Sequence, residues 1–291
     1  MPLPTFLIIG AQKAGTSWLH HRLRQHPEVF LPPQEIHFFD KRHNLQKGPS
    51  WYRQFFANAS GEKAIGEKTP DYYWTKREGA ENHLPNAHQN IHDLLPEAKL
   101  ILVVRNPVKR AISAVNHLLR TRRVSPRYSI DQLLLGDKQH LIREHGVIDY
   151  GRYYRHIQTY LELFEREQLL VLVFEEDVAS SPRQGLQKAA EFLNVDPSFP
   201  FSDLHRRQNP AGVSKGGLYL RYYLPFLTPI VKAVDKYILN SNYKQHPTRD
   251  TVRALYELYE SDNENLFQFL GRTLPSWVPP NDQSDRDHSP S

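Results

Sequence analysis

The chain has 291 residues, of which 39% are hydrophobic and 24% charged, a composition typical of a soluble globular protein with a sizeable core. It contains no cysteine, which excludes disulfide bonds and thiolate metal sites. The formal net charge of +5 suits an anionic ligand but is too small to favour nucleic acid as a partner. No apolar run approaches the roughly 18 residues of a membrane-spanning helix, and no signal peptide opens the chain. We therefore expect a cytoplasmic protein without a transmembrane anchor.

Apolar runs that predict buried strands alternate with patterns that predict helices. Strands are expected at residues 6–9, 64–67, 99–104 and 169–174, and residues 27–33 are expected to form only a short connection. Helices are expected around Leu19 and Leu23, from Pro107 through Leu119, and over residues 51–56, 151–164, 182–193, 218–239 and 248–270. This alternation predicts a single α/β domain, with a mainly parallel sheet flanked by helices on both faces. We expect the domain to span residues 1–277 and residues 278–291 to form a disordered tail.

The first predicted strand runs into a glycine-bounded turn, Gly10-Ala-Gln-Lys13-Ala-Gly15-Thr16-Ser17. Strand, glycine loop and helix together direct free backbone N–H groups at the helix N-terminus, which suits a phosphate. Lys13 adds an ammonium group, and Thr16 and Ser17 add hydroxyls. A Walker A loop has Lys and then Ser or Thr directly after its second glycine, whereas here the lysine lies inside the loop. The turn is P-loop-like without the nucleotide-kinase pattern, and an ordinary strand-turn-helix is the alternative.

Four segments occur in the order seen in the heparan-sulfate-type sulfotransferases, which use 3′-phosphoadenosine 5′-phosphosulfate (PAPS). They are Gly10 to Ser17, Glu35-Ile-His-Phe-Phe-Asp40, Glu67-Lys68-Thr-Pro and Arg105-Asn-Pro-Val-Lys-Arg110-Ala-Ile-Ser113; residues 255–263 and 274–277 resemble the C-terminal end of that family. The resemblance covers residues 5–277. It implies in-line transfer of a sulfuryl group to a hydroxyl or amine, with release of 3′-phosphoadenosine 5′-phosphate (PAP) and no metal. A glycan or small-metabolite acceptor and a bacterial-type, unanchored enzyme are expected.

The same resemblance implies a role for each motif residue in nucleotide binding. Lys13 matches the lysine that bridges donor and leaving-group oxygens, and Gln12, Ala14, Gly15, Thr16 and Ser17 surround the 5′-phosphate. Arg105 and Ser113 match the pair that binds the 3′-phosphate. Lys215-Gly216-Gly217 is similar to a basic-glycine loop that closes over the nucleotide, although Arg206 and Arg207 could serve instead.

The resemblance also identifies residues for the acceptor side of the reaction. Glu35 aligns with the carboxylate that serves as general base, and its apolar neighbours predict partial desolvation and a raised basicity. His37 is the rival base, because in an extended segment it points the same way as Glu35. Lys68 matches a lysine near the sulfuryl group, with a solvated salt-bridge lysine as the alternative.

Several alternatives stay open at this point. The chain could be a P-loop kinase that uses ATP and magnesium, or a nucleotide- or glycan-binding protein without catalysis. Arg120, Arg122 and Arg123 either contact an acidic acceptor or form a solvated helix end. Residues 219–239 either line an acceptor cleft or pack as core.

Overall fold

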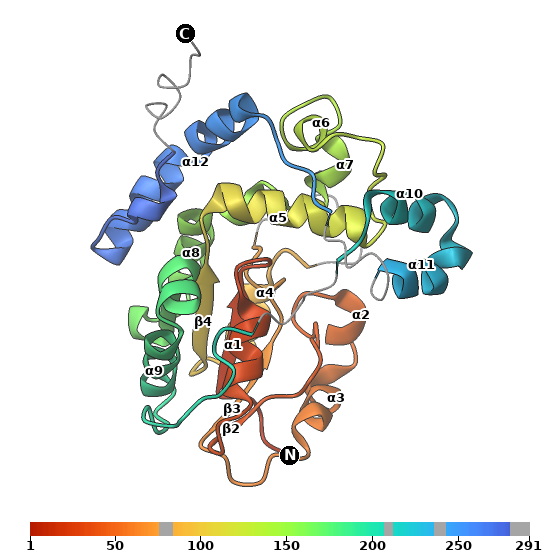
Figure 1. Ribbon diagram of the computed structural model, residues 1–291. Helices are drawn as coiled ribbons and strands as arrows, with labels where there is room; N and C mark the ends of the chain where they lie inside the picture. The colour runs from red at the N-terminus through yellow and green to blue at the C-terminus, as the bar shows by residue number, and fades with distance from the viewer. Residues whose placement is uncertain (76–83, 207–211, 236–242, 280–291) are drawn as a thin grey trace.

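A five-stranded sheet with the strand order β2-β3-β1-β4-β5 lies at the centre of the protein in the computed structural model (Figure 1). The structure describes residues 1–75, 84–206, 212–235 and 243–279. The strands are β1 (Phe6–Gly10), β2 (Val29–Phe30), β3 (Ala64–Lys68), β4 (Lys99–Val104) and β5 (Leu169–Val173). All four neighbouring pairs are parallel, and β1 and β3 are buried along their whole length. Burial on both faces explains why β1 is a continuous apolar run, whereas β3 ends in the buried polar residues Glu67 and Lys68.

Helices cover both faces of this sheet, as predicted. In the strand order, β2 lies to one side of β1, and β4 lies to the other side of β3. The two crossovers, from β1 to β2 and from β3 to β4, therefore run in opposite directions, and because both are right-handed their helices lie on opposite faces of the sheet. On one face, α1 (Thr16–Leu23) contacts α9 (Pro182–Phe192). On the other, α4 (Ala87–Leu94) meets α8 (Tyr153–Leu161) through the His88 and Tyr160 rings, whose centroids are 5.9 Å apart. The strand order reverses at β1, and ligands of such sheets bind at the carboxyl ends of the strands at that point.

In addition to the core around the sheet, a second hydrophobic cluster involves α5 (Pro107–Arg120) and α12 (Arg249–Leu270). In Figure 1, α5 runs across the domain below α12. The remaining helices are short: α2 (Arg42–Leu45), α3 (Gly48–Arg53), α6 (Ile130–Leu134), α7 (His140–Arg143), α10 (Lys215–Tyr223) and α11 (Thr228–Val234). Single 3-10 turns occur at η1 (Gln54–Phe56), η2 (Asp149–Gly151), η3 (Arg166–Gln168), η5 (Pro225–Leu227) and η7 (Pro275–Trp277), and η4 (Phe174–Ser180) is a seven-residue π-helix. Within the four described ranges, no helix combines the length and the apolar content that a bilayer crossing requires. The predicted tail falls almost entirely outside the described residues.

The turn after β4 is fastened to the C-terminal part of the chain. The side-chain amide of Asn106 donates to the hydroxyl of Tyr256 and to the carbonyl of Ser276, both at 3.1 Å. The backbone N–H of Asn106 donates to Glu175, and the indole of Trp277 donates to the same carboxylate at 3.1 Å. These bonds fix the position of the residue that precedes Asn106, which is Arg105.

Candidate active site

The glycine loop between β1 and α1 has the geometry of an anion cradle. Gly15 adopts a φ of 105°, and a Cβ built there would lie 2.8 Å from the Phe174 ring, so only glycine fits. The backbone N–H groups of Trp18 and Leu19 both donate to the carbonyl of Gly15, which begins the helix. The N–H groups before them have no helical acceptor, and the first turn of α1 contains no acidic side chain. This end of α1 therefore attracts an anion.

A cleft of about 1150 Å³ opens in front of the loop and joins most of the predicted site residues. Those that line it are Gln12, Lys13, Gly15, Thr16, Ser17, Glu35, His37, Arg105 and Ser113. Ala14 lies buried beneath the loop. The cleft is also lined by residues that were not predicted, among them Lys41, Asp71, His117, Tyr150, Phe174 and Lys244. Asp71 and Lys41 directly adjoin quoted motifs, which was the only signal in the sequence that pointed to them.

The expected basic-glycine loop has a different structure. Lys215 and Gly216 are exposed in the first turn of α10, where the N–H of Gly217 donates to the Ser214 hydroxyl at 2.9 Å. None of the three lines the cleft, whereas Arg206 does. Arg207 lies outside the described residues. A role for Lys215, Gly216 and Gly217 in covering the nucleotide stays a prediction.

Arg105 is held rigidly beside the glycine loop. Its backbone N–H donates to the hydroxyl of Tyr153 at 3.2 Å, and that hydroxyl donates back to the Arg105 carbonyl at 2.7 Å. The guanidinium lies 4.8 Å from the centre of the Phe174 ring, and its Nη1 donates to the carbonyl of Lys13 at 3.1 Å. Its Nε is buried and has no hydrogen-bond partner among the described residues. Burial lowers the pKa of Arg105, so a nearby anion would stabilise the charged side chain.

Lys13 lies in a strongly positive environment. Burial, followed by the charges of Arg120, Arg105 and Lys244, lowers its pKa from 10.5 to about 8. A negatively charged ligand would remove much of this repulsion, because an opposite charge favours the ammonium form. The loop therefore combines backbone N–H donors with a lysine whose charged form is unfavourable until an anion binds.

Glu35 and His37 form a charged cluster with Lys68 and Asp40. The Lys68 ammonium donates to Glu35 Oε1 at 2.5 Å, while His37 Nε2 lies 3.5 Å from Glu35 Oε2. Burial alone would raise the pKa of Glu35, but His37 and Lys68 outweigh it and lower the pKa to about 2. Burial alone would lower the pKa of His37, but its bonds to Asp40 and Glu35 raise the pKa to about 9. At neutral pH the pair is a carboxylate and an imidazolium.

These values correct two expectations about the acceptor side of the site. The expected rise in the basicity of Glu35 is wrong for the protein without ligands, because two cationic partners override the effect of its apolar neighbours. The segment is not extended either, since His37 adopts a φ of 55°. His37 still reaches Glu35 because this left-handed turn bends the chain back on itself. Lys68 is a buried salt-bridge lysine rather than a solvated one.

Asp71 completes the acidic surroundings of His37. Possible ligand atoms of His37, Asp40 and Asp71 lie within 4.8 Å of one another, which is close enough to share a cation. Internal bonds already engage all three groups, because His37 Nδ1 lies 3.0 Å from Asp40 and the Tyr150 hydroxyl donates to Asp71 at 2.6 Å.

A buried carboxylate, Glu67, organises the segment that contains Glu35. It accepts hydrogen bonds from the hydroxyls of Tyr52 at 2.6 Å, Tyr72 at 2.9 Å and Thr69 at 3.0 Å. The oxygens of Thr69 and Tyr72 in turn accept the backbone N–H groups of residues 36–38. Burial raises the pKa of Glu67 to about 7 despite these donors. The fully buried Glu67 thus holds the segment of Glu35 and His37 in place through the hydroxyls of Thr69 and Tyr72.

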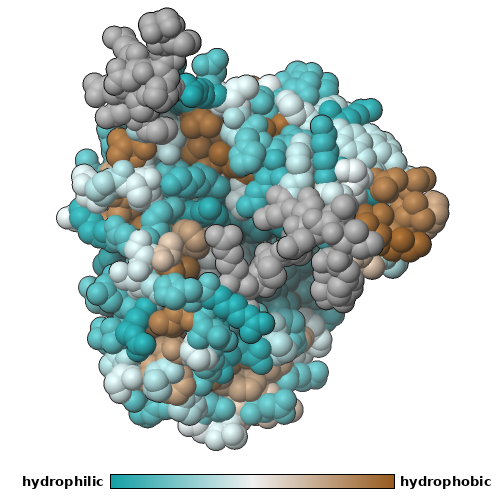
Figure 2. All heavy atoms as spheres, viewed as in Figure 1, coloured by the Kyte–Doolittle hydropathy of each residue, from teal (hydrophilic) through white to brown (hydrophobic). Residues whose placement is uncertain are grey.

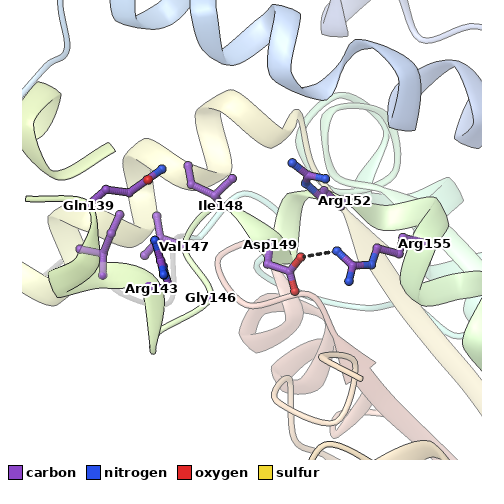
Figure 3. A pocket seen from close by; sticks show the side chains of 9 residues that line it. Gln139, Arg143, Gly146, Val147, Ile148, Asp149, Arg152 and Arg155 are labelled. Carbon is purple, nitrogen blue, oxygen red and sulfur yellow. Dashed lines mark hydrogen bonds and ion pairs between the residues drawn. The ribbon is translucent and has the colours of Figure 1, made fainter. Parts of the chain in front are cut away.

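A second, smaller cavity of about 290 Å³ lies apart from the glycine loop (Figure 3). Its lining consists of Gln139, Ile142, Arg143, Gly146, Val147, Ile148, Asp149, Arg152 and Arg155. Arg155 pairs with Asp149 at 3.3 Å, and Asp149 also accepts from the Trp74 indole. Its charges are partly neutralised, and it shares no lining residue with the cleft described above.

Comparison with known proteins points in the same direction as the geometry. A family model described as the sulfotransferase domain matches residues 3–207. Human heparan sulfate glucosamine 3-O-sulfotransferase 5 is 28% identical over 277 residues, covering 94% of this chain and 73% of the relative. The mouse 3-O-sulfotransferase 3B1 is 31% identical over 280 residues, covering 93% and 64%. Among solved structures, a sulfotransferase from Alicyclobacillus acidocaldarius superposes with a TM-score of 0.68 at 27% identity, covering 95% of this chain and 99% of that one.

Proposed function

The chain belongs to the sulfotransferase domain family, and from this membership we propose how its own residues perform the reaction. The protein is an enzyme that transfers a sulfuryl group to a glycan or a small metabolite, and its family implies PAPS as the donor. PAPS supplies an activated sulfuryl group and leaves as PAP. Because a sulfotransferase activity is shown at the family level, the kinase and the non-catalytic binding protein lose their support.

The proposed nucleotide site rests on one observation, the half-buried Arg105 guanidinium beside the glycine loop. Its unpartnered Nε and the cradle at Gly15 are donors without acceptors, as a nucleotide with two separate phosphates requires. We assign the 5′-phosphate to Lys13, to the hydroxyls of Thr16 and Ser17, and to the backbone N–H groups of the loop, including those of Gln12 and Gly15, whereas the N–H of Ala14 donates to the carbonyl of Ala11 and Ala14 only shapes the loop. The 3′-phosphate falls to Arg105 and Ser113, which line the same cleft.

On the acceptor side, Glu35 is proposed as the general base. Its side chain is 40% exposed and faces the cleft, so an acceptor hydroxyl or amine can reach it. With Lys68 bound, Glu35 is a weak base, and it becomes stronger wherever a second anion draws that ammonium away. His37 serves as a protonated clamp that Asp40 holds against Glu35, because its pKa of about 9 leaves it charged at neutral pH.

The proposed acceptor is a hydroxyl or amine on a glycan or a small metabolite. The curated relatives described above are named as acting on heparan sulfate glucosamine, and the cleft that Glu35 faces is also lined by basic side chains such as Lys41 and Arg123. These side chains favour an acceptor that carries negative charge. We further propose metal-free turnover in the cytoplasm, in keeping with a chain that has no cysteine.

Calorimetric titration with PAP, adenosine 5′-phosphate and ATP tests the donor assignment. In a chelator, PAP is expected to bind far more tightly than either other nucleotide. A preference for ATP in the presence of magnesium would overturn the proposal. Transfer of label from radioactive PAPS to glycan fragments or to small hydroxylated metabolites then identifies the acceptor class, with Glu35→Gln as the inactive control.

A further inference from the structure

Most of the exposed apolar side chains in the described residues gather on one projecting hairpin, formed by α10, η5 and α11. Six of the nine large ones lie in residues 219–230: Tyr219, Leu220, Tyr223, Leu224, Phe226 and Ile230. Phe226 is 74% exposed and Ile230 is 63% exposed. Figure 2 shows this hairpin as a brown patch at the edge of the molecule. Apolar patches of this kind mark surfaces that meet a partner or a membrane.

Polar contacts fasten the base of the hairpin and leave its apolar tip outside. The hydroxyl of Tyr219 donates to the carbonyl of Pro126 at 3.0 Å, and the hydroxyl of Tyr223 lies 3.1 Å from that of Ser125. Arg221 donates to the carbonyl of Arg120 at 3.1 Å. The exposed tip around Phe226 is therefore held by a fixed base. Its apolar side chains form a surface and are not an incompletely packed part of the core.

The hairpin and the turn that supports it carry charge of only one sign. Residues 120–128 and 212–234 contain seven basic and no acidic side chains: Arg120, Arg122, Arg123, Arg127, Lys215, Arg221 and Lys232. The next residue, Asp235, is buried and accepts from the N–H of Ser214. An apolar tip that is flanked by tyrosines and basic groups has the composition of an interfacial membrane segment.

We propose that this hairpin inserts into the headgroup layer of an anionic lipid membrane. Phe226, Ile230 and Leu224 would enter the boundary with the acyl chains, while the exposed side chains of Arg122, Arg127, Lys215 and Lys232 contact acidic headgroups. A second copy is the weaker occupant, because a symmetric dimer through this surface would bring two basic surfaces together. The acidic charge must therefore come from the partner.

Membrane binding would set the position of the cleft as well. His117 and Leu118 near the end of α5 line the cleft together with Arg123 in the following turn, and α10 contacts the same end of α5 through Arg221. The membrane-bound hairpin would thus hold the acceptor side of the cleft beside the lipid surface. This inference goes beyond the transfer reaction and does not depend on which residues bind PAP.

Co-sedimentation of the whole protein with vesicles tests the proposal. Vesicles of phosphatidylcholine containing about one third phosphatidylglycerol are expected to bind it, pure phosphatidylcholine vesicles about tenfold more weakly, and salt is expected to reduce the binding. The double variant Phe226→Ser, Ile230→Ser should lose about tenfold or more of the partitioning. The matched control Leu258→Ser, Val278→Ser changes two exposed apolar side chains outside the hairpin and should bind as the wild type does.

Circular dichroism and PAP titration check that each variant is folded, and the salt dependence of the wild type tests the proposal without any variant. Failure of the wild type to bind anionic vesicles would overturn the proposal, as would equal binding of the Phe226/Ile230 variant. A concentration-dependent dimer that this variant dissociates would identify a second copy as the occupant and would equally overturn it. PAP titration of the same samples reports separately on the donor site.

Discussion

Arg105→Ala should weaken the binding of PAP much more than that of adenosine 5′-phosphate, and the structure divides the loss into two parts. Removal of the guanidinium deletes its hydrogen bond to the carbonyl of Lys13, which helps to hold the glycine loop. Its donor is charged, so the bond contributes about 1.5 kcal/mol, the low end for a charge-assisted bond, and both nucleotides should bind roughly tenfold more weakly. The proposed hydrogen bonds to the 3′-phosphate would be charge-assisted and worth about 1.5–3 kcal/mol, which would add a factor of about 10 to 150 for PAP alone.

Calorimetric titration of both nucleotides into both proteins measures the two parts separately. For each protein, the dissociation constant for adenosine 5′-phosphate is divided by that for PAP. The change in this ratio on substitution isolates the 3′-phosphate contact, because the effect on the loop is the same for both nucleotides and cancels. Thermal unfolding without ligand shows whether the loss of the contact with Phe174 has disturbed the fold. Equal weakening of the two nucleotides would show that Arg105 supports the loop without touching the 3′-phosphate, and the reasoning above would then fail.

Three other substitutions test the rest of the site. Lys13→Ala should abolish sulfuryl transfer in a radiolabelled PAPS assay while the protein stays folded, and near-normal turnover would remove Lys13 from the mechanism. Lys68→Met should raise the pKa of Glu35 by about one unit, as measured by carbon NMR. This is the low end for the loss of a charged hydrogen bond, because Glu35 is partly exposed. An unchanged pKa would contradict the pairing of Lys68 with Glu35. Glu67 has its pKa raised to about 7, so the folded state keeps its proton after the unfolded state has lost it, and the stability of the wild type falls as pH rises from about 4.5 to about 7. Urea unfolding should show that Glu67→Gln lacks this contribution, and parallel pH profiles for variant and wild type would refute it.

The parts of the fold that could be predicted from the sequence are those with a local signal. The apolar runs at residues 6–9 and 99–104 are strands because both faces of the sheet are covered, and Pro107 begins α5 as expected. Strand β2 was missed because two residues show no periodicity, and it exists only through its pairing with Ala64 and Ile65. The four-residue helices α2 and α7 are too short for a pattern in the same way.

In the candidate site, too, the features with a local or topological signal could be predicted, whereas those that depend on distant residues could not. Arg105 and Ser113 lie near the glycine loop because both follow the carboxyl end of a strand beside β1, which topology alone predicts. The basicity of Glu35 could not be predicted, because its pKa depends on Lys68, a residue 33 positions away that β3 brings to it. Lys244 enters the cleft from a distant part of the chain and has no motif around it.

The fastening of Asn106 to Tyr256 and Ser276 has a consequence for how the protein is made. The family match ends at residue 207, yet the turn that carries Arg105 relies on groups that are synthesised about 150 and 170 residues later. On the ribosome, the sheet has its five strands long before the last of these partners emerges. Because such distant contacts close late and slowly, we expect newly made chains to pass through a stage with a formed sheet and an unfinished nucleotide site. That stage is when chaperones would have the most to protect.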